Sequence, residues 1–345
     1  MDKNKKNFLV TVVILTGIFF RFLLLGKRCF WCDEFLAISL SNLTLAEMWE
    51  WVIKNDAHPP LFYGLFHFLL KFTQSEIGLR FLPAVFGASS ILMFWLLLKR
   101  FYSGKNFLLP LVLFVFSPAA ILWSQMVKSY SMITFFSLVS IYCFFSLKTT
   151  EKLIYAVGWV VASIVLFYLH NYGGIIFAAQ VFTLAIKQNE FRMKCFILPV
   201  MIIILTYVPY LSGPLLSQIS FVKGAIHSIR NPFLRLGYAF YYLVFGETLS
   251  PMNLKIVIPG GLLFLYFFLR GIVDWRKNLL KNFSTIVLVL SSFMFFLIPS
   301  TIPQNLVHIQ PLFFIIVATG IDTIVHFNKK MIFSLLLVIA IIPSV

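Results

Sequence analysis

The chain has 345 residues, of which 60% are hydrophobic, 18% aromatic and only 12% charged. Soluble domains carry about 45–50% apolar and about 25% charged residues, and a soluble fold of this size could not hide so much apolar surface. The composition therefore excludes a soluble, disordered or nucleic-acid-binding protein, despite the net charge of +16, and it predicts an all-α polytopic membrane protein.

Basic residues gather in short groups between the apolar runs. By the positive-inside rule these groups lie in the cytoplasm, and the N-terminus lies there with them. Most acidic residues fall in the intervening segments, which are then outside. The basic groups are Lys3/Lys5/Lys6, Lys99/Arg100/Lys105, Lys148/Lys152, Lys187/Arg192/Lys194, Arg270/Arg276/Lys277/Lys281 and Lys329/Lys330. The basic excess thus sets the topology in the membrane and implies no acidic partner.

The first third of the chain contains two spans and a long outer segment between them. A bilayer core about 30 Å thick needs roughly 20 apolar residues per helix, and residues 8–25 and 77–98 meet that need. Within the outer segment 29–76, the mixture of polar and apolar residues over 35–54 predicts one or two helices along the membrane surface. The apolar run 61–73 would be only about 20 Å long as a helix. It is therefore expected to be interfacial or half-inserted.

The remaining spans alternate between the two sides of the membrane and bring the predicted total to about 11. They are 106–122, 130–147, 153–169, 173–186, 195–211, 254–270, 283–299, 311–326 and 331–345. Residues 212–253 form a long outer loop with an amphipathic helix over 232–246. The whole chain, 1–345, is expected to be one transmembrane domain with no soluble domain. Because long loops tend to carry function, the outer face is expected to hold the site.

Polar residues of the first outer loop are the first candidates for chemistry. Asp33 and Glu34 stand side by side at the membrane boundary, where a carboxylate is costly unless something uses it. The alternative is a solvated loop start. His58 precedes Pro59 and Pro60, which fix the backbone as the chain re-enters the membrane. The alternative here is a helix start with an incidental histidine.

Two further polar islands lie on the same predicted face. Residues 117–130 place Lys128 among hydrogen-bonding groups, and residues 168–174 contain His170. Each of these residues, taken alone, is as readily a loop residue with satisfied hydrogen bonds as a site residue. Together with the first loop, they put carboxylates, two imidazoles and a lysine on one face. Transporters tend to place polar groups at the midplane of broken helices, and the middle of these spans is nearly free of them.

Cys29 and Cys32 have the spacing of a redox motif. A redox role would need the thioredoxin-like βαβ pattern, which does not surround them. A structural disulfide in an oxidising exterior and a pair of free thiols are the two alternatives that the sequence leaves open.

The motifs resemble those of the polyprenyl-phosphate-sugar-dependent glycosyltransferases of the C-type (GT-C) superfamily. Within it they are most similar to the relatives of the dolichyl-phosphate-mannose protein mannosyltransferases, a glycosyltransferase family 39-like branch. The resemblance covers roughly residues 15–320. It rests on Trp31-x-Asp33-Glu34, His58-Pro59-Pro60-Leu61-Phe62-Tyr63, Glu76-x-x-x-Arg80-x-x-Pro83, Ser117-Pro118 with Gln125, Lys128-x-Tyr130 and His170-x-Tyr172.

The resemblance implies a fold of many spans with its active site at the outer face of the cell membrane. The donor would be a sugar linked to a polyprenyl phosphate, Asp33 would be the essential acid, and Tyr130, His170 and Tyr172 would contact substrate. Met126 stands where the family commonly has a glutamate, which weakens a metal site because first-loop acids alone offer few oxygen ligands. No cofactor is therefore certain, and a divalent metal ion is left open.

Two further departures concern positive charge. Lys128 stands where relatives have an arginine, and the stretch 303–311 has no arginine where relatives have one. Arginine grips a phosphate through two parallel hydrogen bonds, whereas lysine is a compact point charge. These departures bear on how the donor phosphate would be held.

The expected mechanism is a single displacement with inversion. Asp33 would accept the proton of the acceptor hydroxyl as that hydroxyl attacks the sugar. Glu34 would orient the acceptor or hold a metal. The leaving phosphate needs cations where its charge develops, and Lys128, His58 and Arg230 are the candidates. The acceptor, whether protein, lipid or cell-wall polymer, is not specified. The alternative function is a transporter or flippase of lipid-linked saccharides that performs no chemistry.

Overall fold

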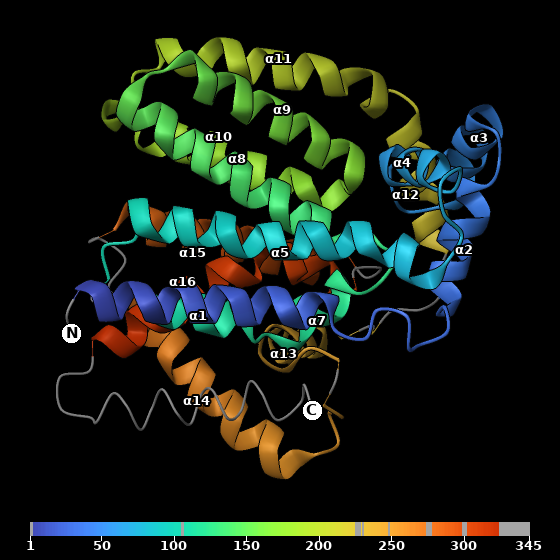
Figure 1. Cartoon of the computed structure of the whole chain (residues 1–345). Coiled ribbons are helices and arrows are strands. Elements are labelled where there is room, and N and C mark those ends of the chain that lie inside the picture. Colours follow the sequence, from blue (N-terminus) through green and yellow to red (C-terminus); the bar gives the residue numbers. More distant parts are fainter. Residues whose placement is uncertain are drawn as a thin grey trace. The chain divides into compact units, whose positions relative to one another are not determined.

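In the computed structural model every element of the described residues is a helix (Figure 1), which confirms the predicted all-α class. The described residues are 3–104, 107–224, 229, 231–247, 249–273, 278–298 and 302–323. Within these residues, six helices are long and apolar enough to cross a membrane, as expected of a multi-pass membrane protein. The predicted count of eleven spans is not confirmed, and the last predicted span, 331–345, lies outside the described residues.

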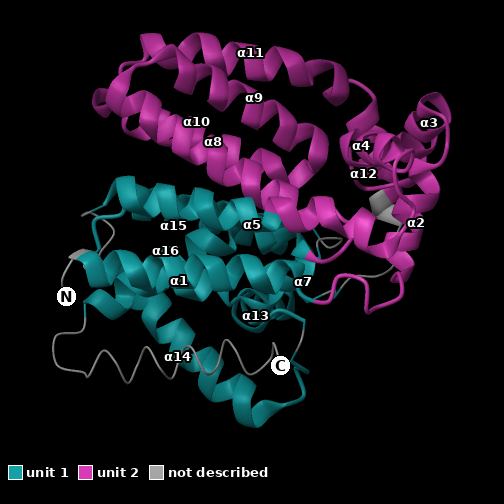
Figure 2. Ribbon diagram, viewed as in Figure 1, with its two compact units in different colours: residues 1–23, 87–124, 229–345 teal, residues 24–86, 125–228 magenta. Residues whose placement is uncertain are grey.

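The chain groups into two compact units, coloured separately in Figure 2. Unit 1 comprises residues 1–23, 87–124 and 229–345, and unit 2 comprises residues 24–86 and 125–228. The helix α5 (Glu76–Phe101) contributes to both units. That the whole chain forms one transmembrane domain stays a prediction.

Unit 2 contains the short helices of the segment 29–76 and four longer apolar helices. Its helices besides α5 are α2 (Cys32–Ser41), α3 (Leu45–Asn55), α4 (Leu61–Leu69), α8 (Tyr130–Thr150), α9 (Leu153–Leu169), η1 (Asn171–Gly173), α10 (Gly174–Ile186), η2 (Gln188–Glu190), α11 (Lys194–Leu211) and α12 (Pro214–Gly224). The apolar helices match the predicted spans within a few residues. Of the apolar stretch of α11, only 22% is buried, against 78% for α8.

The segment 29–76, for which the sequence predicts one or two helices over 35–54 and a short helix in 61–73, contains α2, α3 and α4. Their position outside the membrane stays a prediction. α3 begins at a capping box, in which the Thr44 hydroxyl accepts from the Glu47 amide and Glu47 accepts from the Thr44 amide. α4 has nine residues, which is about 14 Å at 1.5 Å per residue. A single helix of that length cannot cross a core about 30 Å thick.

A buried polar network joins α8, α9 and α10 in unit 2. The Gln180 side chain accepts from Trp159 Nε1 at 2.8 Å and donates to the Ser140 hydroxyl at 2.9 Å. The Ser163 hydroxyl lies 3.2 Å from that of Ser140. Such hydrogen bonds hold helices together in a bilayer, where apolar side chains gain little by leaving lipid. The network fixes the helices whose ends carry the candidate site.

Unit 1 contains α1 (Lys3–Phe22) and the helices that follow α5 or lie in the last third of the chain. They are α6 (Leu108–Val115), α7 (Pro118–Ser124), α13 (Pro232–Phe245), α14 (Leu254–Val273), α15 (Leu279–Leu297), η4 (Pro303–Ile309) and α16 (Gln310–Asp322). α14 and α16 cross closely at Gly271 and Gly320, where a side chain would collide with the backbone of the partner helix.

The prediction of one continuous helix over 106–122 is wrong. The chain breaks between α6 and α7, and Pro118 begins the second piece, a position that suits proline because the first helical N–H needs no partner. The fully buried guanidinium of Arg21 donates to the carbonyl of Val115 at 2.7 Å, where α6 ends. A long-range contact therefore satisfies the freed backbone, and hydropathy alone gave no sign of it.

The long loop 212–253 holds two helices where the sequence predicted one. α13 agrees with the predicted amphipathic helix over 232–246, and its N-cap Asn231 accepts from two backbone amides. Gly246 ends it at φ +65°, a conformation that glycine adopts at no steric cost. α12 was not predicted, and its residue Gln218 proves to support the candidate site.

Candidate functional site

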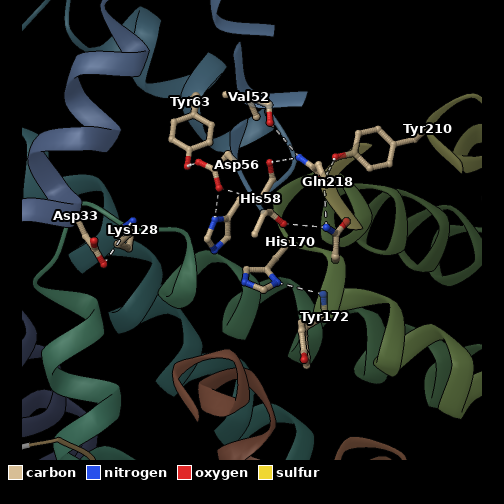
Figure 3. Close-up of polar contacts among 12 residues, drawn as sticks. Asp33, Val52, Asp56, His58, Tyr63, Lys128, His170, Tyr172, Tyr210 and Gln218 are labelled. Atoms are coloured by element: carbon tan, nitrogen blue, oxygen red, sulfur yellow. Dashed lines mark hydrogen bonds and ion pairs between the residues drawn. The ribbon is translucent and has the colours of Figure 1, made fainter. Parts of the chain in front are cut away.

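Asp33 and Lys128 come together as an ion pair in unit 2. Asp33 lies in the first turn of α2, and Lys128 lies in the loop that precedes α8. The Lys128 Nζ is 3.9 Å from Asp33 Oδ2 (Figure 3). The side chain of Asp33 is 59% exposed and that of Lys128 is 14% exposed. The carboxylate is therefore open to a ligand, with a cation beside it.

Glu34 is only 1% exposed and is fully engaged. Its carboxylate accepts from Arg80 Nε at 2.9 Å and Arg80 Nη2 at 2.8 Å, and from the amides of Val127 at 2.9 Å and Trp31 at 3.0 Å. Burial raises the pKa of Glu34, but the hydrogen bonds from Arg80 and the two amides outweigh it and hold the pKa below the usual value.

Arg80 connects this carboxylate to the chain that leads into α2. Its Nη1 donates to the carbonyls of Leu25 and Arg28, and its Nη2 donates to that of Cys29. The residues around Asp33 are thus held by several hydrogen bonds to one buried guanidinium. This geometry leaves Glu34 no open oxygen for an acceptor or a metal, in contrast to the role expected from the sequence.

Asp56, which ends α3, binds the side chain of His58 two residues later. Asp56 Oδ1 accepts from His58 Nδ1 at 2.7 Å and from the His58 amide at 2.9 Å. Asp56 Oδ2 accepts from the Tyr63 hydroxyl of α4 at 2.5 Å. Burial opposes ionisation of Asp56, yet the charge of His58 and the hydrogen bonds from His58 and Tyr63 hold its pKa well below the usual range.

The backbone around His58 is held from other elements of unit 2. Asn171 Nδ2 donates to the Ala57 carbonyl at 2.9 Å, and Gln218 Nε2 of α12 donates to the His58 carbonyl at 2.6 Å (Figure 3). The Tyr210 hydroxyl in turn donates to Gln218 Oε1 at 2.7 Å. The two prolines after His58 fix φ. The imidazole therefore has a backbone held on both sides.

His170 lies against His58, with ring centroids 4.8 Å apart, at the point where α9 ends. Its Nδ1 accepts from the amide of Tyr172 at 3.1 Å, so a neutral His170 carries its proton on Nε2. The rings of Tyr130 and Tyr172 lie 5.9 and 5.7 Å from that of His170. The turn needs Gly173, because a Cβ there would lie 2.7 Å from the carbonyl oxygen of Leu166.

Unit 2 thus brings most of the predicted site residues into two groups, Asp33 with Lys128 and His58 with His170, Tyr130 and Tyr172. Both groups lie near Tyr63. Burial and the Asp56 carboxylate raise the pKa of Tyr63 well above its usual value, and the nearby Tyr130 phenol and Asp33 carboxylate add to this effect. Arg230, the remaining predicted phosphate contact, lies outside the described residues.

Sequence reasoning did not assign Asp56, Tyr63, Arg80 or Gln218 to the site. A local signal existed for Asp56, because an Asp side chain often binds the backbone two residues later. For Gln218, which is far away in the chain, there was none. Cys29 and Cys32 are exposed free thiols. Within the described ranges, no group of three or more His, Cys, Asp or Glu side chains has the geometry to hold a metal ion.

Solved structures share this fold. The crystal structure of ArnT from Cupriavidus metallidurans in the apo state superposes with a TM-score of 0.66 at 14% identity, covering 93% of this chain and 61% of ArnT. The crystal structure of ArnT from the same organism bound to undecaprenyl phosphate gives a TM-score of 0.61 at 15% identity, covering 94% of this chain and 61% of ArnT. No protein-family model and no curated protein matches the sequence.

The likeness confirms the predicted GT-C-like fold and lends no support to the narrower branch of protein mannosyltransferase relatives. At 14% and 15% identity it concerns the fold alone. The chain also spans only 61% of the length of these ArnT chains.

Proposed function

We propose that this protein is a membrane glycosyltransferase that moves a sugar from a polyprenyl-phosphate-linked donor to an acceptor. The observation that carries the proposal is the exposed Asp33 carboxylate, 3.9 Å from the Lys128 ammonium, in a chain with the GT-C fold. A carboxylate and a cation side by side are what a displacement at a sugar phosphate needs. The undecaprenyl phosphate bound to ArnT supports a lipid-phosphate donor.

The reaction follows from these two groups. The acceptor hydroxyl attacks the anomeric carbon and passes its proton to Asp33, and such positioned proton transfer contributes typically about 10²–10⁴-fold. The bond from the anomeric carbon to the phosphate oxygen breaks, and its electron pair stays on the phosphate. Lys128 and His58 stabilise the charge that develops there. Attack opposite the leaving group inverts the anomeric centre.

In this proposal Glu34 positions the site and does not itself react. Its neighbour in the chain is Asp33, and its oxygen Oε1 accepts from the amide of Val127, the neighbour of Lys128. The buried carboxylate therefore ties together the two loops that carry the acid and the cation. Tyr130, His170 and Tyr172 remain the proposed substrate contacts. The sequence motifs alone support kinship with the protein mannosyltransferase relatives.

A transfer assay tests the function directly. The purified protein in liposomes, given an undecaprenyl-phosphate-linked radiolabelled sugar and a membrane extract as the acceptor source, is expected to release undecaprenyl phosphate and move label to the acceptor. A flippase would move the intact lipid-linked sugar across the bilayer without breaking the bond. Movement of intact donor with no label transferred, even when donor is supplied on both sides, would favour the transporter.

The proposed site faces the outside of the cell, which predicts the topology. A reporter fused after Lys54 is expected to read external, and one fused after Arg100 is expected to read cytoplasmic, because the basic group at 99–105 stays inside. Paired phosphatase and fluorescent-protein fusions at both positions make the measurement. An external signal after Arg100 would mean that the 61–73 segment crosses the membrane, and the sidedness of every later helix would invert.

Lys128 is expected to act on the donor more than on the acceptor. Lys128→Ala removes a charge-assisted contact worth roughly 1.5–3 kcal/mol, so the KM for the donor should rise about 10- to 100-fold while that for the acceptor changes little. Lys128→Arg keeps the charge and should retain part of the activity. Kinetics with donor and acceptor varied separately decide the question. An unchanged donor KM in the Lys128→Ala variant would mean that Lys128 does not contact the donor and only places its ammonium group at the membrane surface.

A further inference from the structure

Asp56 is a buried carboxylate with three short hydrogen bonds, all from residues within the next seven positions of the chain. Its side chain is 10% exposed. Oδ1 receives the ring Nδ1 and the backbone amide of His58, and Oδ2 receives the Tyr63 hydroxyl. A carboxylate with this many donors keeps one orientation. The low pKa of Asp56 means that it is also charged throughout the physiological range.

This arrangement fixes which nitrogen of His58 faces outward. An ionised carboxylate can only accept a hydrogen bond, so His58 Nδ1 carries a proton. The other nitrogen, Nε2, has no hydrogen-bond partner among the residues that the structure describes, and the side chain is 22% exposed. Gln218 holds the carbonyl of the same residue, so the backbone that carries the ring is fixed, and turning the ring away breaks its hydrogen bond with Asp56.

We infer that Asp56 is a positioning residue that holds His58 with Nε2 toward the donor phosphate. The inference rests on the proposed function, in which His58 contacts that phosphate. With Nδ1 bound to Asp56, Nε2 is the ring nitrogen that can meet a phosphate oxygen. Donor binding then depends on the Asp56 carboxylate, which keeps the ring in that orientation.

A ring contact supports the same orientation. The ring of His170 lies edge-on against that of His58, with centroids 4.8 Å apart and an angle of 74° between the planes. The Nδ1 of His170 accepts from the amide of Tyr172, so this second ring is itself held. The His58 ring therefore has Asp56 at Nδ1 and His170 against it.

The experiment measures binding of undecaprenyl phosphate to the full chain in detergent, together with transfer kinetics. Asp56→Asn keeps the shape of the side chain and removes its charge, which weakens its hydrogen bond with His58 Nδ1. The Kd for undecaprenyl phosphate and the donor KM should each rise about tenfold or more. The kcat should fall as well, because His58 also stabilises the charge that develops on the leaving phosphate.

Two further variants separate positioning from structure. Tyr63→Phe removes one donor that orients Asp56 and leaves its contact with His58, so the Kd for undecaprenyl phosphate should rise by a smaller factor. His58→Lys replaces the oriented ring by a flexible cation, and in that background Asp56→Asn should no longer change the Kd. The control is Glu50→Gln, which removes an exposed carboxylate of α3 that pairs with Lys54, and it should change nothing.

An Asp56→Asn protein that melts like the wild type and binds undecaprenyl phosphate with an unchanged Kd overturns the inference. If that variant does not fold, an unchanged Kd for Tyr63→Phe overturns it. A wild-type protein that neither binds the lipid phosphate nor transfers sugar overturns the proposed function as well. A wild-type protein that transfers sugar, beside an Asp56→Asn variant with an unchanged Kd, overturns the inference alone.

Discussion

Asp33→Asn is expected to lower the rate of sugar transfer by about 10²–10⁴-fold, the usual contribution of a positioned general base. The side chain is 59% exposed, so the amide costs little stability, and the variant should insert and melt like the wild type. The loss should appear in kcat, because an amide cannot take the proton of the acceptor hydroxyl. Transfer of labelled sugar from an undecaprenyl-phosphate donor in liposomes gives the rate.

Glu50→Gln is the matched control, since it removes an exposed carboxylate from α3. A comparison of glycans from cells that carry each variant extends the test to the natural acceptor. Near-normal transfer by a folded Asp33→Asn protein would show that another group takes the proton. Glu34 would be a poor replacement, because all its oxygens already accept from Arg80 and backbone amides.

Arg80→Met is expected to lower the free energy of unfolding by about 3–5 kcal/mol, the usual cost of leaving one partner of a buried ion pair alone. The change strands the carboxylate of Glu34 and removes the donor to the carbonyls of Leu25, Arg28 and Cys29. Unfolding in detergent, followed by denaturant or heat, measures the loss. Transfer should fall too, because the loop that carries Asp33 loses its anchor.

The exposed pair of Arg192 and Glu151 supplies the control. The side chains of Arg192 and Glu151 are 74% and 38% exposed, and pairs of that kind contribute about 0–1 kcal/mol. Arg192→Met should therefore change stability little. Replacing both Glu34 and Arg80 by methionine should recover part of the stability lost in the single variant. Equal losses from Arg80→Met and Arg192→Met would contradict a buried pair.

The stability that Glu34 contributes also depends on pH. Its pKa is lower in the folded protein than its usual value, so its contribution is present at neutral pH and is lost as the pH falls through the folded pKa. The difference in stability between wild type and Arg80→Met should therefore shrink in acid. The same denaturation experiment, repeated at decreasing pH, measures it.

The sequence predicted the helices well where polar residues mark both ends of an apolar run. The predicted span 153–169 coincides with α9, which follows Glu151 and Lys152 and stops at His170. The prediction from the sequence failed at 106–122, because the break before Pro118 is stabilised by Arg21, almost a hundred residues earlier. Hydropathy reports which segments are apolar, but it does not report which distant side chain satisfies a broken backbone.

The candidate site could likewise be predicted from the sequence only in part. Asp33, His58 and Lys128 could be selected by residue type at a predicted membrane boundary, and the structure then places Asp33 and Lys128 together. Their pairing, and the burial of Glu34 beside Arg80, depend on contacts between residues 46 or more positions apart. Two adjacent acids look equivalent in a sequence. In the fold the side chain of Asp33 is 59% exposed, whereas Glu34 is only 1% exposed.

The exposed apolar surface of α11 links the surrounding lipid to the candidate site. α11 has 18 residues, about 27 Å of helix, against a hydrocarbon layer about 30 Å thick. Near its end, Tyr210 holds Gln218, and Gln218 holds the His58 carbonyl. Hydrophobic mismatch tilts or displaces a helix by amounts set by bilayer thickness. We therefore expect the acyl-chain length of the surrounding membrane to act, through α11 and two hydrogen bonds, on the backbone that carries His58.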